Sequence, residues 1–218
     1  SVTGGWHETH VPQLPASLPQ SGFAFLAYNI KKEVSVPVMA SNRISSPDAA
    51  EKLLKDGYAD MVSIGRGLIA DPQWVNKAMA GKADEIRPCV ACLQGCMDSV
   101  MSGKPVTCVA NPLAGYEGVR KIEKCDTPKY VMIVGAGMAG LEAAVTASIA
   151  GHHVDLYEKK DEIGGQLWIA GAPPHKGELH KFVDYYQAML WKYNVSLHLN
   201  TKVDDRLIKE KNPDFLIV

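Results

Sequence analysis

The chain has 218 residues, a net charge of -1, 46% hydrophobic residues and 22% charged residues. This length allows one large domain or two modest ones, and the composition is that of a folded globular protein. The near-neutral charge argues against a nucleic-acid or anionic-membrane partner, and no apolar run is long enough to cross a bilayer.

Residues 1–86 alternate short apolar runs with helical patterns. The elements expected from periodicity and helix-start signals are, in chain order, a helix over about 23–34, a strand at VPVMA, a helix over 47–55 opened by Ser46 and Pro47, a strand at MVSIG and a helix opened by Asp71 and Pro72. Strand–helix alternation of this kind predicts a parallel sheet or barrel.

Residues 87–115 predict an irregular segment with short helices, because they hold three prolines and four closely spaced cysteines. Cys89, Cys92, Cys96 and Cys108 are spaced C-x2-C-x3-C-x11-C. Four thiolates this close can converge on one group, and four is the ligand count of a cubane iron–sulfur cluster. Structural zinc, a disulfide pair and unrelated buried thiols stay open, although zinc more often uses two separated C-x2-C pairs.

The cysteines and the chain ends also bear on the compartment and on completeness. Five cysteines, four of them clustered, favour a reducing compartment, so we expect the cytoplasm. The first residues, SVTGGWHETH, do not have the pattern of a signal peptide. The chain begins at Ser1 and stops in an apolar, strand-like run, PDFLIV, so we expect a piece of a longer protein.

Residues 116–128 form a charged connector, and strand–helix alternation returns beyond it. The elements expected there are a strand at YVMIV, a helix over 141–150, a strand at HVDLY, a helix with an apolar face over about 179–189, and strands at VSLHL and FLIV.

A G-x-G-x-x-G sequence at residues 135–140 follows the YVMIV strand directly and opens a helix. In this context Gly135 allows a tight turn, Gly137 lets a pyrophosphate approach the backbone, and Gly140 allows close helix–strand packing. Glu158 ends the next strand, where a carboxylate would bind the ribose of an adenosine. The alternatives are an ordinary tight turn for the glycines and a solvated charge for Glu158.

Two further groups of residues suit phosphates or nucleotides. Arg43 and Arg66 follow the carboxyl ends of predicted strands, the face of a parallel barrel that carries active sites. Gly65 with Arg66 suits a phosphate, through backbone N–H groups and a guanidinium; surface ion pairs are the alternative for both arginines. The sequence Gly164-Gly165-Gln166 suits a second backbone approach to a nucleotide, with a plain loop as the alternative.

The motifs TGGWHE, SNRI, SIGRGLIADP, the four-cysteine spacing, VGAGMAGLEAA and YEKKDEIGGQ occur in this order. With them the chain resembles the iron–sulfur branch of the old yellow enzyme family, the group of 2,4-dienoyl-CoA reductase and 2-enoate reductase, with trimethylamine dehydrogenase more distant. The resemblance covers nearly the whole chain and implies an α/β fold. The implied parts are the last three or so βα units of an FMN-binding (β/α)8 TIM barrel (1–86), a 4Fe-4S segment (87–115), a linker (116–128) and a truncated Rossmann-like FAD domain (129–218).

The resemblance also implies roles for single residues. His7 is similar to the family's active-site histidine, with Trp6 and Glu8 beside the substrate. The implied FMN contacts are Arg43, Gly65 and Arg66, and the implied cluster ligands are Cys89, Cys92, Cys96 and Cys108. The implied FAD contacts are Gly135, Gly137, Ala139, Gly140, Glu158, Gln166 and Lys176. The chain departs from the family at His10, where arginine is usual, and Cys125 has no counterpart, so we expect it to be a bystander thiol.

The implied activity is NAD(P)H-dependent reduction of a C=C bond conjugated to a carbonyl, in an enoate, an enone or a dienoyl-CoA. The implied route of the electrons runs from FAD through the 4Fe-4S cluster to FMN. Negative charge builds on the carbonyl oxygen in such a reaction, and His7 would supply a hydrogen bond or a proton. Two alternatives stay open, an amine dehydrogenase of the trimethylamine type and a non-catalytic flavin-binding or electron-transfer module. The substrate, the choice of NADH or NADPH and a homo-oligomeric state are also open.

Overall fold

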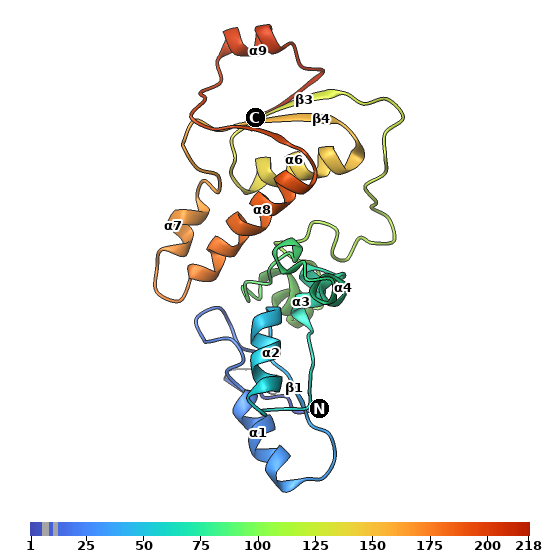
Figure 1. Ribbon diagram of the computed structural model, residues 1–218, viewed down its shortest axis with the longest axis vertical. Coiled ribbons are helices and arrows are strands. Elements are labelled where there is room, and N and C mark those ends of the chain that lie inside the picture. Colours follow the sequence, from blue (N-terminus) through green and yellow to red (C-terminus); the bar gives the residue numbers. More distant parts are fainter. Residues whose placement is uncertain (6–8, 11–12) are drawn as a thin grey trace. The chain divides into compact units, whose positions relative to one another are not determined.

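The computed structural model describes residues 1–5, 9–10 and 13–218, which form two compact units (Figure 1). The first unit holds Ser1–Val119 together with Pro174–Lys176, and the second holds Arg120–Pro173 and Gly177–Val218. The division between Val119 and Arg120 falls inside the stretch expected to be a connector. Each unit has its own parallel sheet, of two strands in the first and four in the second.

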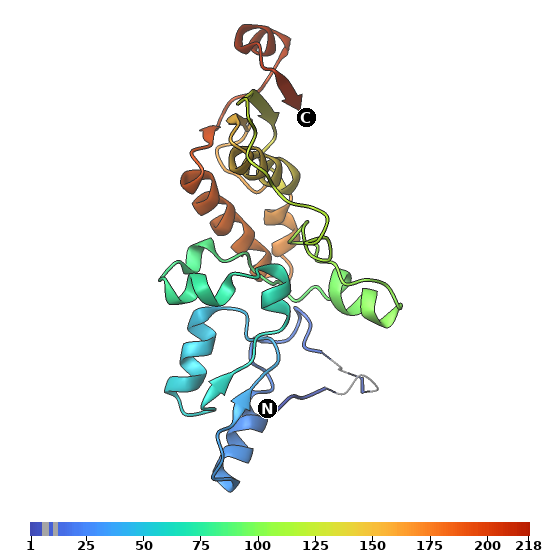
Figure 2. The ribbon, with the colours of Figure 1, turned by 90° about the vertical axis from the view of Figure 1, so that its right-hand side faces the viewer.

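The first unit begins with strands and helices that alternate as the sequence predicts. Its elements are α1 (Ala24–Glu33), β1 (Met39–Ala40), α2 (Pro47–Lys55), β2 (Met61–Val62), α3 (Arg66–Ala70) and α4 (Trp74–Met79). Strands β1 and β2 lie side by side in parallel (Figure 2), and Val2 adds a parallel bridge to Ala40. Two parallel strands, with a helix after each and one further parallel bridge, show the strand–helix alternation expected from the sequence.

Local signals explain the sharp boundaries of α2. The Ser46 hydroxyl accepts a hydrogen bond from the Ala49 N–H at 3.3 Å, and Pro47 occupies the first helical turn. A cap of this type contributes about 1 kcal/mol to helix stability. The apolar residues of α1, α2 and α4 then pack around β1 in one cluster, whose fully or nearly buried members include Ala27, Val38, Ala40, Leu53 and Trp74.

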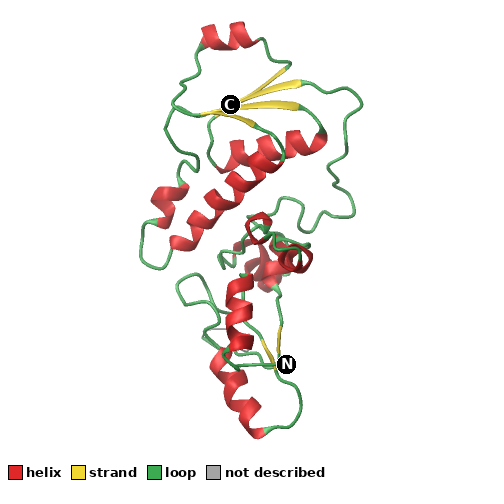
Figure 3. Cartoon of the chain, viewed as in Figure 1, coloured by secondary structure: helices red, strands yellow, loops and turns green. Residues whose placement is uncertain are grey.

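The cysteine-bearing segment follows and is mostly irregular. It contains a 3-10 turn η1 (Ala83–Glu85), a π-helical turn η2 (Gln94–Asp98) and the short helix α5 (Ser99–Met101). Loop then runs from residue 102 to residue 129, as the green trace in Figure 3 shows. The short helices among loops agree with the prediction from the prolines and cysteines.

The second unit is a parallel sheet with the strand order β5-β4-β3-β6. Its elements are β3 (Tyr130–Val134), α6 (Met138–Ala150), β4 (His153–Tyr157), α7 (Leu167–Gly171), η3 (Gly177–His180), α8 (Lys181–Lys192), β5 (Ser196–His198), α9 (Asp205–Lys211) and β6 (Phe215–Ile217). Helices α6 and α8 pack against each other beside the sheet (Figure 1). All predicted strands are confirmed, whereas α7 and α9 are not among the predicted helices.

The order of the strands creates a switch point between β3 and β6. The chain runs from β3 outward to β5 on one side and returns to the other side with β6. Ligands of open α/β sheets bind at the carboxyl ends of strands at such a point. The central strand β3 is buried over Val131–Ile133, so the strand that ends at this switch point is anchored in the core. In the described part of the chain no helix has both the length and the apolar character needed to cross a membrane.

A polar group centred on Asp155 joins β3, β4 and β5. The carboxylate of Asp155 accepts hydrogen bonds from the Tyr130 hydroxyl at 2.9 Å and the Tyr157 hydroxyl at 3.2 Å, and His198 Nε2 lies 3.5 Å away. Burial alone would raise the pKa of Asp155, but the Tyr130 hydrogen bond and the charge of His198 outweigh it and lower the pKa below 3.8.

We expect Asp155→Asn to make the second unit less stable at neutral pH and equally stable in acid. A lowered folded pKa contributes stability above the ordinary value of 3.8, and this contribution is lost as the pH falls below it. Denaturant unfolding at several pH values measures the effect. A difference between wild type and variant that persists at pH values well below the ordinary pKa would contradict this assignment.

Candidate functional site

The first unit has a cavity of about 390 Å³ at the carboxyl ends of β1 and β2. This volume is within the usual range for a small-molecule or cofactor site. The loops after both strands line it with Asn42, Arg43, Ser63, Gly65 and Arg66, and Cys89 and Met97 complete one side. The structure therefore brings together Arg43, Gly65 and Arg66, as the sequence predicts.

The two arginines give this cavity a positive, preorganised wall. Arg66 Nη2 donates to the Leu14 carbonyl at 3.0 Å, while its buried Nη1 has no hydrogen-bond partner among the described residues. Arg43 is 8% exposed, donates to the Ala16 carbonyl at 3.3 Å and has a left-handed backbone with φ of 54°. A Cβ atom at Gly65 would extend into open space and not into protein. This wall suits an anion such as a phosphate.

Asn42, in the loop after β1, is hydrogen-bonded to the backbone of the TGG segment (residues 3–5). Its side chain accepts from the Gly4 N–H at 2.9 Å and donates to the Gly4 carbonyl at 3.1 Å. Gly4 has little room, because a Cβ atom there would lie 2.5 Å from Phe23. No local pattern in the sequence indicates this anchor, since Asn42 and Gly4 are 38 positions apart. The predicted site residues Trp6, His7 and Glu8 come directly after this segment but lie outside the described residues, and His10 is exposed.

We expect Asn42→Ala to destabilise the first unit by about 1–3 kcal/mol, since it leaves the Gly4 amide and carbonyl without these partners. Denaturant unfolding measures the effect. Asn76→Ala is the matched control, because the Asn76 amide donates to Gln73 Oε1 at 2.7 Å on the exposed surface. Equal losses in the two variants would contradict the anchoring role.

All four predicted cysteines line one small pocket in the first unit, with Arg66, Ile69 and Val109 among its other walls. Arg66, Ile69 and Cys89 also line the cavity at the strand ends. The two spaces therefore share a wall. A group bound by the cysteines would adjoin a ligand of the arginine-lined cavity.

The backbone around Cys92 and Cys96 is shaped for this convergence. Ala91 and Leu93 have left-handed φ values of 51° and 64°, which non-glycine residues adopt at a cost of about 1–3 kcal/mol each. The Thr107 N–H donates to the Gly95 carbonyl at 2.6 Å, and a Cβ atom at Gly95 would lie 2.8 Å from the Thr107 carbonyl oxygen. This close approach brings the π-helical turn beside Cys108. Strain of this kind is typical of functional sites.

The chemistry of the four sulfurs suits a bound metal centre. All five cysteines of the chain are free thiols. Burial raises the pKa of the Cys89 and Cys96 thiols, while backbone N–H groups and the charge of Arg66 act in the opposite direction. A coordinated metal would reverse the balance, because a coordinating thiol is deprotonated. Across the described ranges no three His, Cys, Asp or Glu side chains lie close enough to hold a single metal ion.

The glycine turn of the second unit has the geometry that a dinucleotide requires. Gly135 has a left-handed φ of 99°, and a Cβ atom at Gly135 or Gly137 would enter open space. A Cβ atom at Gly140 would overlap the Gly135 carbonyl oxygen, so only glycine allows this close packing. The space in front of the turn is a cavity of about 610 Å³, also lined by Ala139, Gly164, Gln166 and the end of β6. The cavity thus lies at the switch point of the sheet.

Glu158 is 8% exposed and lines a second hollow of this unit, beside Lys159, Thr201 and Lys202. Its carboxylate accepts hydrogen bonds from the Ala136 N–H at 2.8 Å and the Lys160 N–H at 3.0 Å. These bonds orient the side chain, and each carboxylate oxygen keeps a lone pair for a further donor such as a ribose hydroxyl. Lys176 is not among the residues that line either hollow, and Pro174–Lys176 is grouped with the first unit.

Comparison with known proteins finds one family model that matches part of the first unit and another that matches part of the second. Residues 17–85 match the NADH:flavin oxidoreductase / NADH oxidase family, and residues 133–186 match the NAD(P)-binding Rossmann-like domain. The chain belongs to the NADH:flavin oxidoreductase / NADH oxidase family. The old yellow enzyme resemblance is thereby confirmed.

Relatives in this family align along nearly the whole chain. A metal reductase of Desulforamulus reducens is 44% identical over 202 residues, 93% of this chain and 30% of the relative. An NADH oxidase of Thermoanaerobacter brockii is 41% identical over 221 residues, 100% of this chain and 34% of the relative. A solved complex of 2-naphthoyl-CoA reductase with 2-naphthoyl-CoA is 34% identical, has a TM-score of 0.93 and covers 97% of this chain and 33% of that one. The chain spans about a third of the length of these relatives.

The residues that line these pockets fit FMN, an iron–sulfur cluster and FAD, the cofactors expected in this family. Arg43, Gly65 and Arg66 would hold the phosphate end of FMN, since they form a positive wall with open space in front of it. The four cysteines would hold an iron–sulfur cluster. Gly135, Gly137 and Glu158 would hold the pyrophosphate and ribose of FAD. Cys125 lies 3.6 Å from His152 Nδ1 in the second unit, apart from the four clustered cysteines in the sequence.

Proposed function

We propose that the chain is the cluster-bearing segment of an NAD(P)H-dependent flavin and iron–sulfur reductase. Its substrate would be a C=C bond conjugated to a carbonyl, in an enoate, an enone or an unsaturated acyl-CoA. The naphthoyl-CoA relative supports this substrate class, since its named ligand is a thioester conjugated to an unsaturated ring. The setting we propose is the cytoplasm, with His7, Trp6 and Glu8 at the substrate.

The shared wall between the two pockets of the first unit carries this proposal. A substrate-reducing flavin and a one-electron centre must lie close together, and Arg66, Ile69 and Cys89 line both spaces. When bound, the flavins would supply two-electron chemistry and the cluster would supply single-electron transfer. Cys89 would then be both a cluster ligand and a wall of the flavin pocket.

The spacing of the four cysteines favours a cluster over zinc. Zinc sites made of four cysteines more often use two separated C-x2-C pairs, whereas this chain has C-x2-C-x3-C-x11-C. Four cysteines are also the ligand set of a cubane, and all four line one pocket.

The test is an anaerobic reduction of the full-length protein. NAD(P)H should bleach the flavin absorbance, and an enoate or enone added afterwards should restore it. Iron and acid-labile sulfide should be present in equal amounts, about four of each for one cubane. Reduction without reoxidation by any activated alkene would contradict the substrate class. Flavin reduction by an amine in the absence of NAD(P)H would select the amine dehydrogenase instead.

A further inference from the structure

Asp71 is a buried hub that ties the start of the cysteine-bearing segment to α4. Its carboxylate accepts hydrogen bonds from the Gln73 N–H at 2.9 Å, the Lys77 ammonium at 2.6 Å and the Arg87 N–H at 2.9 Å. The residue is 4% exposed, so these charge-assisted bonds act where water does not compete. Lys77 also donates to the Glu85 carbonyl at 2.8 Å, which adds a second tie to the same stretch.

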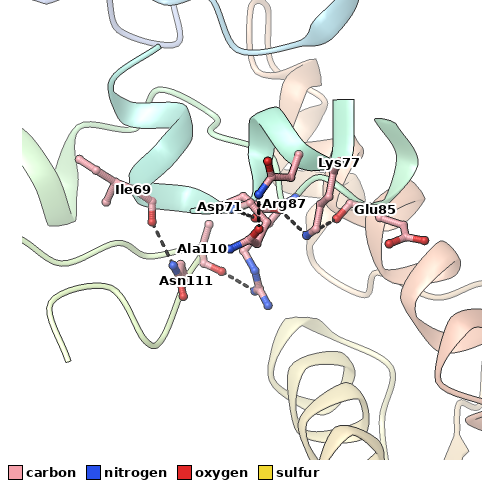
Figure 4. Close-up of polar contacts among 9 residues, drawn as sticks. Ile69, Asp71, Lys77, Glu85, Arg87, Ala110 and Asn111 are labelled. Atoms are coloured by element: carbon pink, nitrogen blue, oxygen red, sulfur yellow. Dashed lines mark hydrogen bonds and ion pairs between the residues drawn. The ribbon is translucent and has the colours of Figure 1, made fainter. Parts of the chain in front are cut away.

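The end of the segment is tied back to the same region (Figure 4). Arg87 Nη1 donates to the Ala110 carbonyl at 2.6 Å. Asn111, 7% exposed, donates to the Ile69 carbonyl at 3.0 Å and accepts from the Leu113 N–H at 3.0 Å. Arg87 precedes Cys89 by two residues, and Ala110 follows Cys108 by two. The hydrogen bonds therefore close a ring just outside the first and last cysteines.

Helix α3 links this ring to the cavity at the strand ends, the proposed flavin pocket. Ile69, which accepts the bond from Asn111, lines both the cavity at the strand ends and the cysteine pocket. Arg66 begins the same helix, and Asp71 is the residue that ends it. Helix α3 thus contributes Arg66 and Ile69 to the shared wall. Through Ile69 and Asp71 it is also hydrogen-bonded to both ends of the cysteine segment.

We propose that Asp71, Arg87 and Asn111 are positioning residues that hold the four cysteines in a cluster-binding arrangement and fix its distance from the flavin pocket. The inference rests on the proposed function, because it assigns a role toward the cluster. The loop between the ties has left-handed residues at Ala91 and Leu93, a conformation that persists only when its surroundings hold it. The ring supplies that constraint through side chains that do not bind metal themselves.

Asp71→Asn tests the ring, and Asp60→Asn is the control for the loss of an aspartate–lysine pair outside it. The substitution keeps the size of the side chain and removes the charge that binds Lys77 and the Arg87 N–H. Asp60 has the same pair of partner types, since it accepts from the Val38 N–H and the Lys31 ammonium, each at 2.8 Å, and it lies between α2 and β2. Because the Asp60 side chain is 40% exposed and the Asp71 side chain 5%, Asp60→Asn is expected to lose less stability, so denaturant unfolding is measured beside each release rate.

The readouts are the rate of iron release to a chelator from the anaerobic full-length protein and the EPR spectrum of the reduced cluster. We expect Asp71→Asn to release iron about tenfold faster or more and to broaden the EPR spectrum, since residues that orient metal ligands change metal binding by about 10–100-fold. Asp60→Asn should keep the wild-type rate and spectrum. Arg87→Lys, which keeps the backbone bond to Asp71 but loses the planar guanidinium at Ala110, should release iron at an intermediate rate.

Each outcome decides between the inference and the proposed function. Wild-type protein without iron would overturn the proposed cluster itself. Wild-type protein with a cluster, together with wild-type release rates in Asp71→Asn and Arg87→Lys, would overturn only the positioning role. Equally fast release in Asp60→Asn would show a general loss of stability and would also overturn it. If Asp71→Asn does not fold, the rate in Arg87→Lys decides.

Discussion

Cys96→Ser in the full-length protein is expected to abolish the iron–sulfur cluster. Cys96 lies in the π-helical turn and faces the same pocket as Cys89, Cys92 and Cys108. Residues that merely orient a metal ligand change affinity by about 10–100-fold, so removal of a ligand should cost at least that much. The flavin of the second unit should still be reduced by NAD(P)H, whereas the alkene should no longer reoxidise the protein.

Iron content, the visible spectrum of the cluster and anaerobic turnover check this prediction. Cys125→Ser is the matched control, because Cys125 is also a free, partly buried thiol but belongs to the second unit. It should keep its iron and its turnover. A Cys96→Ser protein with the full iron content, or a Cys125→Ser protein without iron, would contradict the assignment of the ligands.

Gly140→Ala is expected to remove the dinucleotide from the second unit and to destabilise that unit. The new Cβ atom would overlap the Gly135 carbonyl oxygen, which belongs to backbone and cannot move aside as a side chain can. Overpacking of this kind costs about 1–3 kcal/mol, and the relief it demands would displace the turn that faces the pyrophosphate. The first unit and its cluster should be unaffected.

The amount of bound FAD and the thermal unfolding of the protein measure this effect. Gly177→Ala is the matched control, because a Cβ atom there meets nothing within 4 Å and its φ is not left-handed. The control should bind FAD as the wild type does. Full FAD binding by Gly140→Ala would show that the turn is not the pyrophosphate site.

Local signals in the sequence were sufficient for most of the fold. Ser46 and Pro47 define the start of α2, and the apolar run YVMIV defines β3 to the residue. The missed helix α9 also had its signals, since Asp204 caps it at the Leu207 N–H and Asn212 ends it with a left-handed φ of 44°. Charged residues fill α9 and none of its residues is buried, so no apolar periodicity marked it.

The predicted site residues come from motifs that are contiguous in the sequence, and the missed ones do not. Arg66, Cys89 and Gly135 stand in short patterns whose chemistry can be inferred directly from residue type and spacing. Asn42 and Asp71 act on partners 38 and 16 positions away, through backbone groups that carry no residue identity. Only the folded chain brings these atoms together, so no local pattern could indicate them.

The wall formed by Arg66, Ile69 and Cys89 also has a consequence for protein engineering. Under the proposed function, a substitution of Arg66 chosen to change flavin affinity will also alter the electrostatic surroundings of the sulfurs. Conversely, under the proposed function a substitution of Ile69 meant to tune the midpoint potential of the cluster will also change the shape of the cavity at the strand ends. Both the flavin affinity and the midpoint potential of the cluster should therefore be measured in every such variant, since a change in one is expected to change the other.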